Sequence, residues 1–305
     1  MHVSFNGNIV SADGKVVTAT LWQPGVSSVE REPMALEMFY NHPTEMKYPH
    51  WHAQVEVNFI IKGTVHYLMA SHEITLSEGE MCLFWGGLPH QMDWRTDDAI
   101  YTGCHLPLVH FFRLQLPDMV PHRLMAGETL LMRATDAADY TNFERWHRYA
   151  RSQDAAKAEH AVNELLLRLE RVRFEPYELV PGGGASCAVG PFDQQSSRAV
   201  LRVCDFIAGN FLTEIDSIDI AAAAGLHPKY MMNVFRRATG MTLSEYVNLL
   251  RLSYAQALLM KDDANVLRVA MESGFGSLSA FNKSFRKLAG MSPSDFRRSI
   301  ATGRA

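Results

Sequence analysis

One short pattern occurs twice in the last third of the chain, first over 225–246 and again over 274–296. Both copies start with a glycine and continue, after one extra residue in the second copy, with a run of identical or similar residues. The matched pairs are Phe235/Phe285, Arg236/Arg286, Arg237/Lys287, Gly240/Gly290, Met241/Met291, Ser244/Ser294, Glu245/Asp295 and Tyr246/Phe296. Two copies are too few for a solenoid, which needs at least about three repeats. The repetition therefore indicates a small module that is present twice.

Each copy begins with a short apolar helix that ends at a glycine. The expected helices span 218–224 and 266–273, and Gly225 and Gly274 follow them directly. A glycine in this place caps a helix in the left-handed conformation and lets the chain turn sharply into a second helix. The apolar residues of that second helix recur at helical spacing, so one of its faces is expected in a core. They are Met231, Val234, Phe235 and Ala238 in the first copy, and Phe281, Phe285 and Leu288 in the second.

The opposite face of each second helix is polar or cationic. It carries Lys229, Met232, Asn233 and Arg236 in the first copy, and Ser279, Asn282, Lys283 and Arg286 in the second. A helix of this kind suits the major groove of DNA, because cations meet phosphates while amides and hydroxyls reach the base edges. The alternative is an ordinary helical domain with a solvated basic surface, which gives no reason for the repetition.

Charge separates the C-terminal third from the rest of the chain. Residues 196–305 contain 14 Lys and Arg against 9 Asp and Glu, a net charge of +5, whereas residues 1–195 contain 15 against 24, a net charge of −9. The overall charge of −4 therefore hides a cationic segment attached to an acidic body, as expected of a domain that binds nucleic acid.

The stretch 270–297 resembles the signature of the AraC-type transcription regulators, and the resemblance covers about residues 200 to 300. It implies two helix-turn-helix units joined by a long helix, here at 243–259, that place two recognition helices in successive major grooves. By position, the implied base-reading residues are Lys229, Met232, Asn233, Ser279, Asn282 and Lys283. Met232 departs from the polar residues often found at its position, and it either reads a thymine methyl group or packs.

The length of 305 residues and a hydrophobic content of 47% suggest two globular domains. The segment 181–191 is rich in Gly and Pro, which indicates a linker. We expect an effector-binding and dimerisation domain at 1–180, a linker at 181–195 and the DNA-binding domain at 196–305. No apolar run is long enough for a membrane span and the first residues lack a basic signal region, which predicts a cytoplasmic protein. The cysteines show no paired spacing, so reduced and mostly buried thiols are expected at Cys82, Cys104, Cys187 and Cys204.

Short strand-like segments separated by Gly-rich turns fill the stretch from about 34 to 112. They are expected at 35–40, 56–61, 64–69, 73–76, 81–84 and 99–106. This spacing favours an all-β sandwich or a small barrel. With the helices that follow, the fold class is α+β, a cupin-like β-barrel ahead of an all-α domain of two helix-turn-helix units.

A group of histidines and one glutamate resembles the cupin pattern of His-x-His, a glutamate four residues later, a glycine and a distant histidine. The residues are His50, His52, Glu56, Gly63 and His90. Because residues two apart in a strand share a face, these side chains are expected inside the barrel. Three imidazoles and one carboxylate suit zinc, iron or manganese, so a divalent metal held by His50, His52, Glu56 and His90 is one hypothesis. The other, which requires no cofactor, is a polar ligand pocket built from the same groups.

Aromatic residues near the histidines favour a carbohydrate as ligand. Trp22, Trp51, Trp85, Trp94, Tyr40 and Phe84 offer flat faces for the C–H side of a sugar ring, and polar side chains offer paired donors and acceptors. The order of residues in 50–58, 83–85 and 89–91 resembles AraC-type regulators of melibiose utilisation, which implies an α-galactoside such as melibiose as effector. The expected effector-binding residues are His50, Trp51, His52, Gln54, Glu56, Asn58, Trp85, His90 and Gln91.

A helix is expected from Phe143 to Phe174, with an apolar stripe in its second half. The stripe consists of Val162, Leu165, Leu166, Leu169 and Val172. It must be buried either on the chain's own β domain or on a partner's copy. Since the family resemblance implies a dimer contact after the barrel, a homodimer is expected, and both modes of burial stay open.

The function that these features favour is a DNA-binding transcription regulator, not an enzyme. A small sugar bound in the barrel would change the arrangement or dimerisation of the DNA-binding domain, and the protein would contact RNA polymerase as an activator. The sugar must differ in its affinity for two arrangements, since tight binding alone shifts no equilibrium. Two alternatives are a regulator whose barrel only dimerises, and a metal-dependent cupin enzyme fused to a DNA-binding domain.

Overall fold

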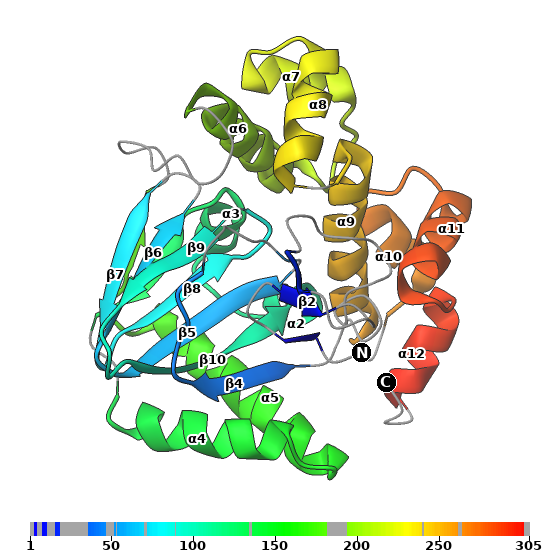
Figure 1. The fold of residues 1–305 in the computed structure, drawn as a ribbon. Coiled ribbons are helices and arrows are strands. Elements are labelled where there is room, and N and C mark those ends of the chain that lie inside the picture. The colour runs from blue at the N-terminus through cyan, green and yellow to red at the C-terminus, as the bar shows by residue number, and fades with distance from the viewer. Residues whose placement is uncertain are drawn as a thin grey trace.

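The computed structural model describes residues 3–4, 8–10, 16–18, 36–46, 52, 54–69, 72–88, 90–133, 136–181, 194–239, 241–261 and 264–301. Strands dominate the N-terminal part and helices the C-terminal part (Figure 1). This order confirms the α+β class expected from the sequence. Among the described residues, no helix is both long enough and apolar enough to cross a membrane.

Two antiparallel sheets face each other in the N-terminal part, as a sandwich and not as a closed barrel. The larger sheet, in the order β12-β11-β8-β5-β10-β4, consists of β4 (Glu37–Asn41), β5 (Gln54–Lys62), β8 (Met81–Trp85), β10 (Ile100–Pro107), β11 (Thr129–Met132) and β12 (Glu178–Val180). The smaller sheet, in the order β7-β6-β9, consists of β6 (Thr64–Met69), β7 (Glu73–Ser77) and β9 (His90–Arg95). A separate sheet consists of β1 (Val3–Ser4), β2 (Asn8–Val10) and β3 (Val16–Thr18).

Side-chain alternation gives the larger sheet two buried faces. Ile60 on β5 packs with Tyr67 and Phe84 in a core between the two sheets. Val55 and Val57, on the other face of β5, belong to a second core under the helices. Since successive side chains of a strand point to opposite faces, the even-numbered residues of β5 face the smaller sheet and the odd-numbered ones face the helices.

The strands expected from the sequence are confirmed with small shifts at their ends, but β1, β2, β3, β9, β11 and β12 were not expected. The buried positions of β9 are occupied by His90 and Met92, and its other residues are polar apart from the exposed Trp94. The alternation of apolar and polar residues that marks a half-buried strand is therefore weak in this segment.

Two helices cover the outer face of the larger sheet. They are α4 (Ala138–Ala150) and α5 (Ala155–Glu170), and Phe143 of α4 stacks on Phe59 of β5 with 5.2 Å between the ring centroids. The prediction of one helix from Phe143 to Phe174 was wrong, because the chain turns between the two helices. Asp154 caps the second helix by accepting a hydrogen bond from the backbone N–H of Ala156.

The apolar stripe of α5 is buried within the chain itself. Leu165, Leu166, Leu169 and Val172 belong to the core under the larger sheet, and Val162 packs against that core. Of the two modes of burial that the sequence left open, intramolecular packing is therefore the one observed. Short helical segments complete this part of the chain: α2 (Leu108–Phe111), α3 (Val120–Met125) and η1 (Arg171–Arg173). Cys82, Cys104 and Cys204 are buried thiols, as expected, whereas Cys187 lies outside the described residues.

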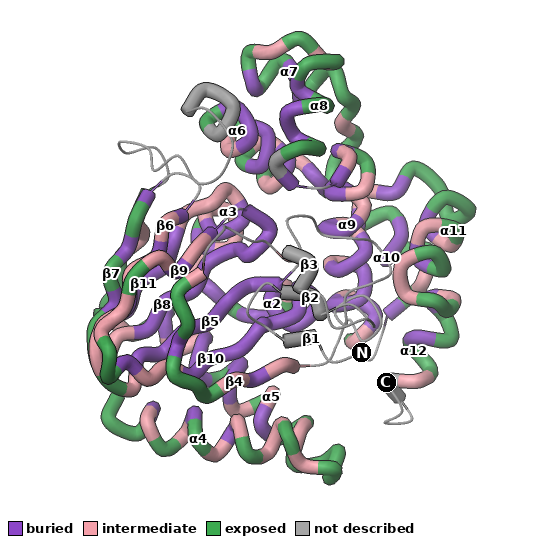
Figure 2. Tube along the Cα trace, viewed as in Figure 1, coloured by how far each residue is buried: buried purple, intermediate pink, exposed green. Residues whose placement is uncertain are grey.

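The C-terminal part is entirely helical among the described residues. It consists of α6 (Gln194–Asn210), α7 (Ser217–Ala224), α8 (Pro228–Thr239), α9 (Leu243–Leu259), α10 (Val266–Glu272), α11 (Leu278–Ala289) and α12 (Pro293–Ala301). The long connecting helix expected at 243–259 is α9, which is largely buried along its length (Figure 2). Most of the expected linker, residues 182–193, lies outside the described residues.

The core under the larger sheet continues into the C-terminal helices without a break. Phe112, which follows α2, lies with its ring centroid 5.8 Å from that of Phe211 and 5.6 Å from that of Tyr254. The indole Nε1 of Trp85, at the end of β8, donates a hydrogen bond of 2.9 Å to the hydroxyl of Tyr246 on α9. The strand that forms one wall of the sandwich is thus joined directly to the helix that connects the two helix-turn-helix units.

Candidate DNA-reading helices and candidate effector pocket

Two helix-turn-helix units occupy the C-terminal part, α7 with α8 and α10 with α11. Asp216 forms a capping box at the start of α7, and Asn265 caps α10. Gly225 and Gly274 lie at the turns with φ of +66° and +78°, a conformation that glycine adopts without the strain that a side chain brings. The repeated pattern in the sequence therefore corresponds to two copies of one structural unit.

The expected polar face of α8 is exposed to solvent. Lys229, Asn233 and Arg236 are exposed, and Met232 is 43% exposed. On the opposite side Met231, Val234 and Phe235 are buried in the core.

The second recognition helix, α11, has the same arrangement. Phe281 and Phe285 are buried, while Ser279, Lys283 and Arg286 are exposed and Asn282 is half-buried. These four polar residues line one surface groove together with Leu278. Lys229, Arg236, Lys283 and Arg286 supply positive charge that can meet phosphates, although Glu245 lies near Arg236 and Asp295 near Arg286.

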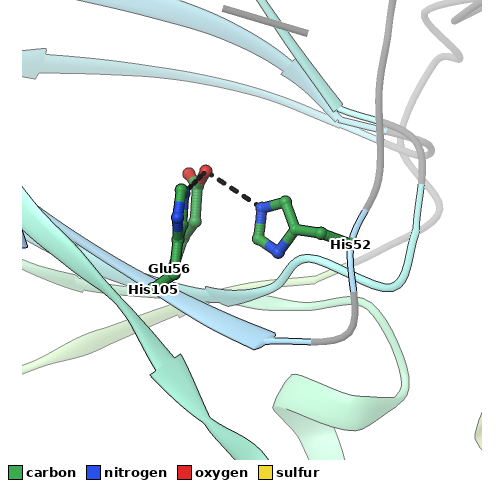
Figure 3. A group of neighbouring side chains, drawn as sticks. All are labelled: His52, Glu56 and His105. Carbon is green, nitrogen blue, oxygen red and sulfur yellow. Dashed lines mark hydrogen bonds and ion pairs between the residues drawn. The ribbon is translucent and has the colours of Figure 1, made fainter. Parts of the chain in front are cut away.

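The candidate effector pocket lies between the two sheets, around the carboxylate of Glu56. The Nε2 atoms of His52 and His105 each lie 3.2 Å from Glu56 Oε1, and both rings turn toward it (Figure 3). His90 Nε2 lies 3.6 Å from the same oxygen. Asn58 donates a hydrogen bond of 3.0 Å to the other oxygen, Oε2. Side chains from three strands and one loop thus converge on one buried carboxylate.

The pKa values of this group follow from burial and hydrogen bonding. Burial alone would raise the pKa of Glu56, but hydrogen bonds from His105, His52 and His90 outweigh it and hold that pKa well below its usual range. Burial lowers the pKa of His52 to about 4, although its hydrogen bond to Glu56 opposes the shift. At neutral pH the pocket therefore contains a charged carboxylate beside the neutral imidazole of His52.

The two ring nitrogens of His90 face different groups. His90 Nδ1 lies 2.9 Å from the carbonyl oxygen of Leu88, and because a carbonyl only accepts, Nδ1 carries a proton. His90 Nε2 faces the carboxylate of Glu56, whose oxygen Oε1 lies 3.6 Å away.

The donor set also fits a divalent metal. The ligand atoms of His52, Glu56 and His105 lie within 4.8 Å of one another, and imidazole and carboxylate groups suit zinc, iron or manganese. In the arrangement described, however, the two imidazole nitrogens at 3.2 Å hydrogen bond to the carboxylate. A nitrogen cannot use the same position to donate a proton and to bind a metal, so a metal would replace these hydrogen bonds.

Two further polar groups support a ligand pocket. Gln54 and Asn58 are buried, and their side chains lie on the same face of β5 as Glu56. Gln54 Oε1 and Asn58 Oδ1 accept no hydrogen bond from the residues that the structure describes. A buried acceptor without a donor is unfavourable, and a hydroxyl-rich ligand or ordered water would supply the donors.

The other expected effector-binding residues have different surroundings. His50 and Trp51 lie outside the described residues. Trp85 pairs with Val55 in the register and points to the helices, so the structure does not bring it to the Glu56 group. Gln91 is half-buried and its amide donates a hydrogen bond to the carbonyl oxygen of Met46.

The expected aromatic faces are dispersed as well. Phe84 contacts His90 with 5.0 Å between ring centroids, inside the sandwich. Trp94 and Tyr40 are 49% and 36% exposed, and Trp22 lies outside the described residues. Phe39 lies beside His105, with 5.6 Å between ring centroids. The aromatic rings beside this group thus include Phe84 and Phe39 and, among the described residues, none of the expected tryptophans.

Sequence reasoning missed two members of the group. His105 on β10 lies directly opposite Glu56 on β5, and Glu37 on β4 lies opposite His105. Burial raises the pKa of Glu37, while the charge of His105 opposes the shift. The signal for both is cross-strand register, which depends on strand pairing and cannot be read from a local motif.

Two known domain families match the chain, each over one part of it. The family described as "Cupin domain" matches residues 37–102, and the family described as "Helix-turn-helix domain" matches residues 220–299. Both matches agree with the folds described above and confirm the cupin-like and helix-turn-helix assignments made from the sequence.

Relatives extend the likeness over most of the chain. The melibiose operon regulatory protein of Escherichia coli (strain K12) is 27% identical over 272 residues, which cover 89% of this chain and 90% of that protein. The HTH-type transcriptional activator RhaR of Yersinia pestis bv. Antiqua (strain Angola) is 24% identical over 277 residues, with coverage of 88% and 90%.

Among solved structures, ToxT from Vibrio cholerae O395 has a TM-score of 0.35 at 12% identity and covers 87% of this chain and 97% of that one. The two domain matches and the similarity over 89% of the chain point to one family. The chain belongs to the AraC-type transcription regulators, with a cupin domain ahead of the helix-turn-helix domain that binds DNA.

Proposed function

We propose that this regulator activates a sugar-utilisation operon when a small sugar binds between the two sheets of the cupin domain. The observation that carries the proposal is the buried polar group around Glu56, in a chain that exposes two recognition helices. Its carboxylate, imidazoles and unsatisfied amide oxygens are groups that recognise hydroxyls in pairs of donors and acceptors. We assign the effector site to His52, Gln54, Glu56, Asn58, His90 and His105, with Phe84 as an aromatic wall.

The similarity to the melibiose operon regulatory protein supports an α-galactoside such as melibiose as the effector. The similarity to a protein described as a transcriptional activator supports activation, with RNA polymerase as a partner. We propose residues 1–180 as the effector-binding domain, 181–195 as the linker and 196–305 as the DNA-binding domain. A homodimer stays part of the proposal, but the stripe of α5 is buried in its own chain and does not supply the contact.

The DNA-reading faces are proposed from the exposed residues of the two recognition helices. They are Lys229, Met232, Asn233 and Arg236 on α8, and Ser279, Asn282, Lys283 and Arg286 on α11. Because the two faces differ in their residues while their frameworks match, each subunit would read two unlike half-sites. The thioether of Met232 suits the methyl group of a thymine better than a polar base edge.

Fluorescence anisotropy with labelled intergenic DNA tests DNA binding. We expect affinity to fall steeply with salt, and Lys283→Ala to reduce the slope of log K against log salt by about one. Lys157→Ala is the control, since Lys157 is an exposed lysine on α5. No specific binding to any intergenic fragment would refute the proposed reading function.

Isothermal titration calorimetry with melibiose and a panel of other disaccharides and galactosides tests the effector. We expect one sugar to bind and to change the affinity of the protein for its DNA. If no sugar binds to the folded protein, the effector class is wrong, even where DNA binding is intact.

A further inference from the structure

The two helix-turn-helix units share the helix α9, and its charged residue Arg251 lies where they meet. Leu243, Tyr246 and Leu250 of α9 belong to the core that contains the first unit, whereas Leu252 and Leu259 belong to the core of the second. Arg251 lies between these two sets of side chains. We refer to Arg251, the segment 211–213, Gly274 and Phe275 as the junction.

Arg251 contacts both units. Its Nε donates a hydrogen bond of 2.6 Å to the carbonyl oxygen of Phe211, and its Nη2 donates one of 2.7 Å to that of Thr213. Both carbonyls lie between α6 and α7, and we count α6 and this segment with the first unit, because α6 packs against α7 and α8. Its guanidinium also lies 5.9 Å from the centroid of the Phe275 ring, in the second unit. A planar guanidinium with two charge-assisted hydrogen bonds fixes orientation as well as distance.

Close backbone packing supports the same junction. A Cβ atom at Gly274 would lie 2.8 Å from the carbonyl oxygen of Phe211 and 2.9 Å from the carbonyl carbon of Leu212. Its counterpart in the first unit, Gly225, has no atom within 4 Å of the same position. Both glycines have positive φ, which favours glycine at each position. At Gly274 the neighbouring backbone also leaves no room for a side chain. The turn of the second unit thus lies directly against the backbone of the first.

We propose that Arg251 is a positioning residue that fixes the separation and relative orientation of α8 and α11, so that the protein prefers two half-sites at one spacing. The inference rests on the proposed reading of DNA by both helices. When two reading helices are held rigidly, the second contact forms at a high effective concentration, provided that the half-sites match the geometry of the protein. A loose junction loses this advantage and tolerates other spacings.

The test uses the full chain and the duplex that the wild-type protein enriches from a random-sequence library, with the half-sites mapped by footprinting. Insertion of one base pair between the half-sites rotates one against the other by about 35°. Affinity is measured for the intact duplex, for the duplex with the insertion and for each half-site alone. Arg251→Gln is compared with Arg202→Gln, because Arg202 donates to the carbonyl oxygen of Ala224 at 3.2 Å and 2.8 Å within the first unit.

We expect Arg251→Gln to bind single half-sites like the wild type, but to lose on the order of tenfold in affinity for the intact duplex. The loss on insertion should shrink in this variant and persist in Arg202→Gln. An unchanged insertion penalty in Arg251→Gln would overturn the inference, as would a wild-type protein that tolerates the insertion. If the wild type enriches no duplex, DNA reading itself fails, which is a separate result.

A second pair of variants covers the case in which Arg251→Gln does not fold. Gly274→Ala and Gly225→Ala place the same strained residue at matched turns, with φ of +78° and +66°. Only Gly274→Ala forces the two units apart. We expect the insertion penalty to change in Gly274→Ala and not in Gly225→Ala, and equal penalties in the two variants would contradict the proposal.

Discussion

The hydrogen bond between Trp85 and Tyr246 joins the cupin domain to α9, and we expect its removal to destabilise the whole protein. Both side chains are buried, with exposed fractions of 2% and 0%. Burial raises the pKa of Tyr246 well above its usual range, so the hydroxyl remains protonated and can accept from Trp85. The change Tyr246→Phe removes one oxygen atom and preserves both rings.

The expected loss of stability comes from the side chain of Trp85, which remains after the substitution. After Tyr246→Phe, the indole N–H of Trp85 stays buried without its acceptor, which costs about 1–3 kcal/mol of unfolding free energy. The cavity left by one oxygen atom adds little to this. Tyr177→Phe is the matched control, because Tyr177 is 38% exposed, and we expect a change of less than about 0.5 kcal/mol for it.

Urea unfolding gives the measurement, followed by far-ultraviolet circular dichroism and by tryptophan fluorescence. A double-mutant cycle with Trp85→Phe isolates the pair, and we expect a coupling energy of about 0.5–1.5 kcal/mol. Because one apolar core spans both parts, the two signals should report a single transition. A coupling energy near zero, or two separate transitions, would refute the argument that this contact joins the domains.

Three further results are expected. The buried fork between Arg168 and Asp139, at 2.6 Å and 2.7 Å, would be broken by Asp139→Asn. Because Arg168 keeps its hydrogen bond to Glu175, we expect a loss of about 3 kcal/mol in urea unfolding, at the low end for a broken buried pair. Asp136→Asn, at an exposed pair, should change little. Burial lowers the pKa of His72 from 6.5 to about 4, so between these pH values the unfolded chain binds a proton at this residue and the folded chain does not. The free energy of unfolding should therefore fall by about 3 kcal/mol from pH 6.5 to 4. A His72→Gln variant that loses as much stability over this range would contradict this. Glu56→Gln should weaken sugar binding at least about tenfold in calorimetry. Dialysis of the wild-type protein against a chelator should leave its affinity for the sugar unchanged, whereas a loss of sugar affinity after dialysis would show a metal in the pocket.

The helical part of the chain was readable from the sequence because its signals are local. Helical spacing of apolar residues and two glycines after short helices are contained within single segments, and α9 has the bounds expected for it. The exposed and buried faces of α8 and α11 follow from the same spacing. The break between α4 and α5 was missed because the capping residue Asp154 gives a weaker signal than the apolar stripe beyond it.

The side chains of the pocket could be predicted from the sequence only in part, because strand pairing decides which of them lie together. His52, Glu56 and His90 were all expected from the cupin pattern. His105 comes from a distant strand, and only the register of β10 against β5 places it beside Glu56. Phe84 and Trp85 were both expected at the ligand, and composition does not show that the pleat turns Phe84 inward while Trp85 hydrogen bonds to Tyr246 on α9.

Because side chains alternate between the two faces of β5 and β8, neighbouring residues of these strands have different roles. Gln54, Asn58 and Phe84 point toward the smaller sheet, the side on which we propose that the effector binds. Trp85 and Val57, on the other side of the same strands, pack against the helices. A library that randomises only the inward positions should therefore yield sensors with new ligands that still switch, and relatives with different sugars should differ mainly at those positions.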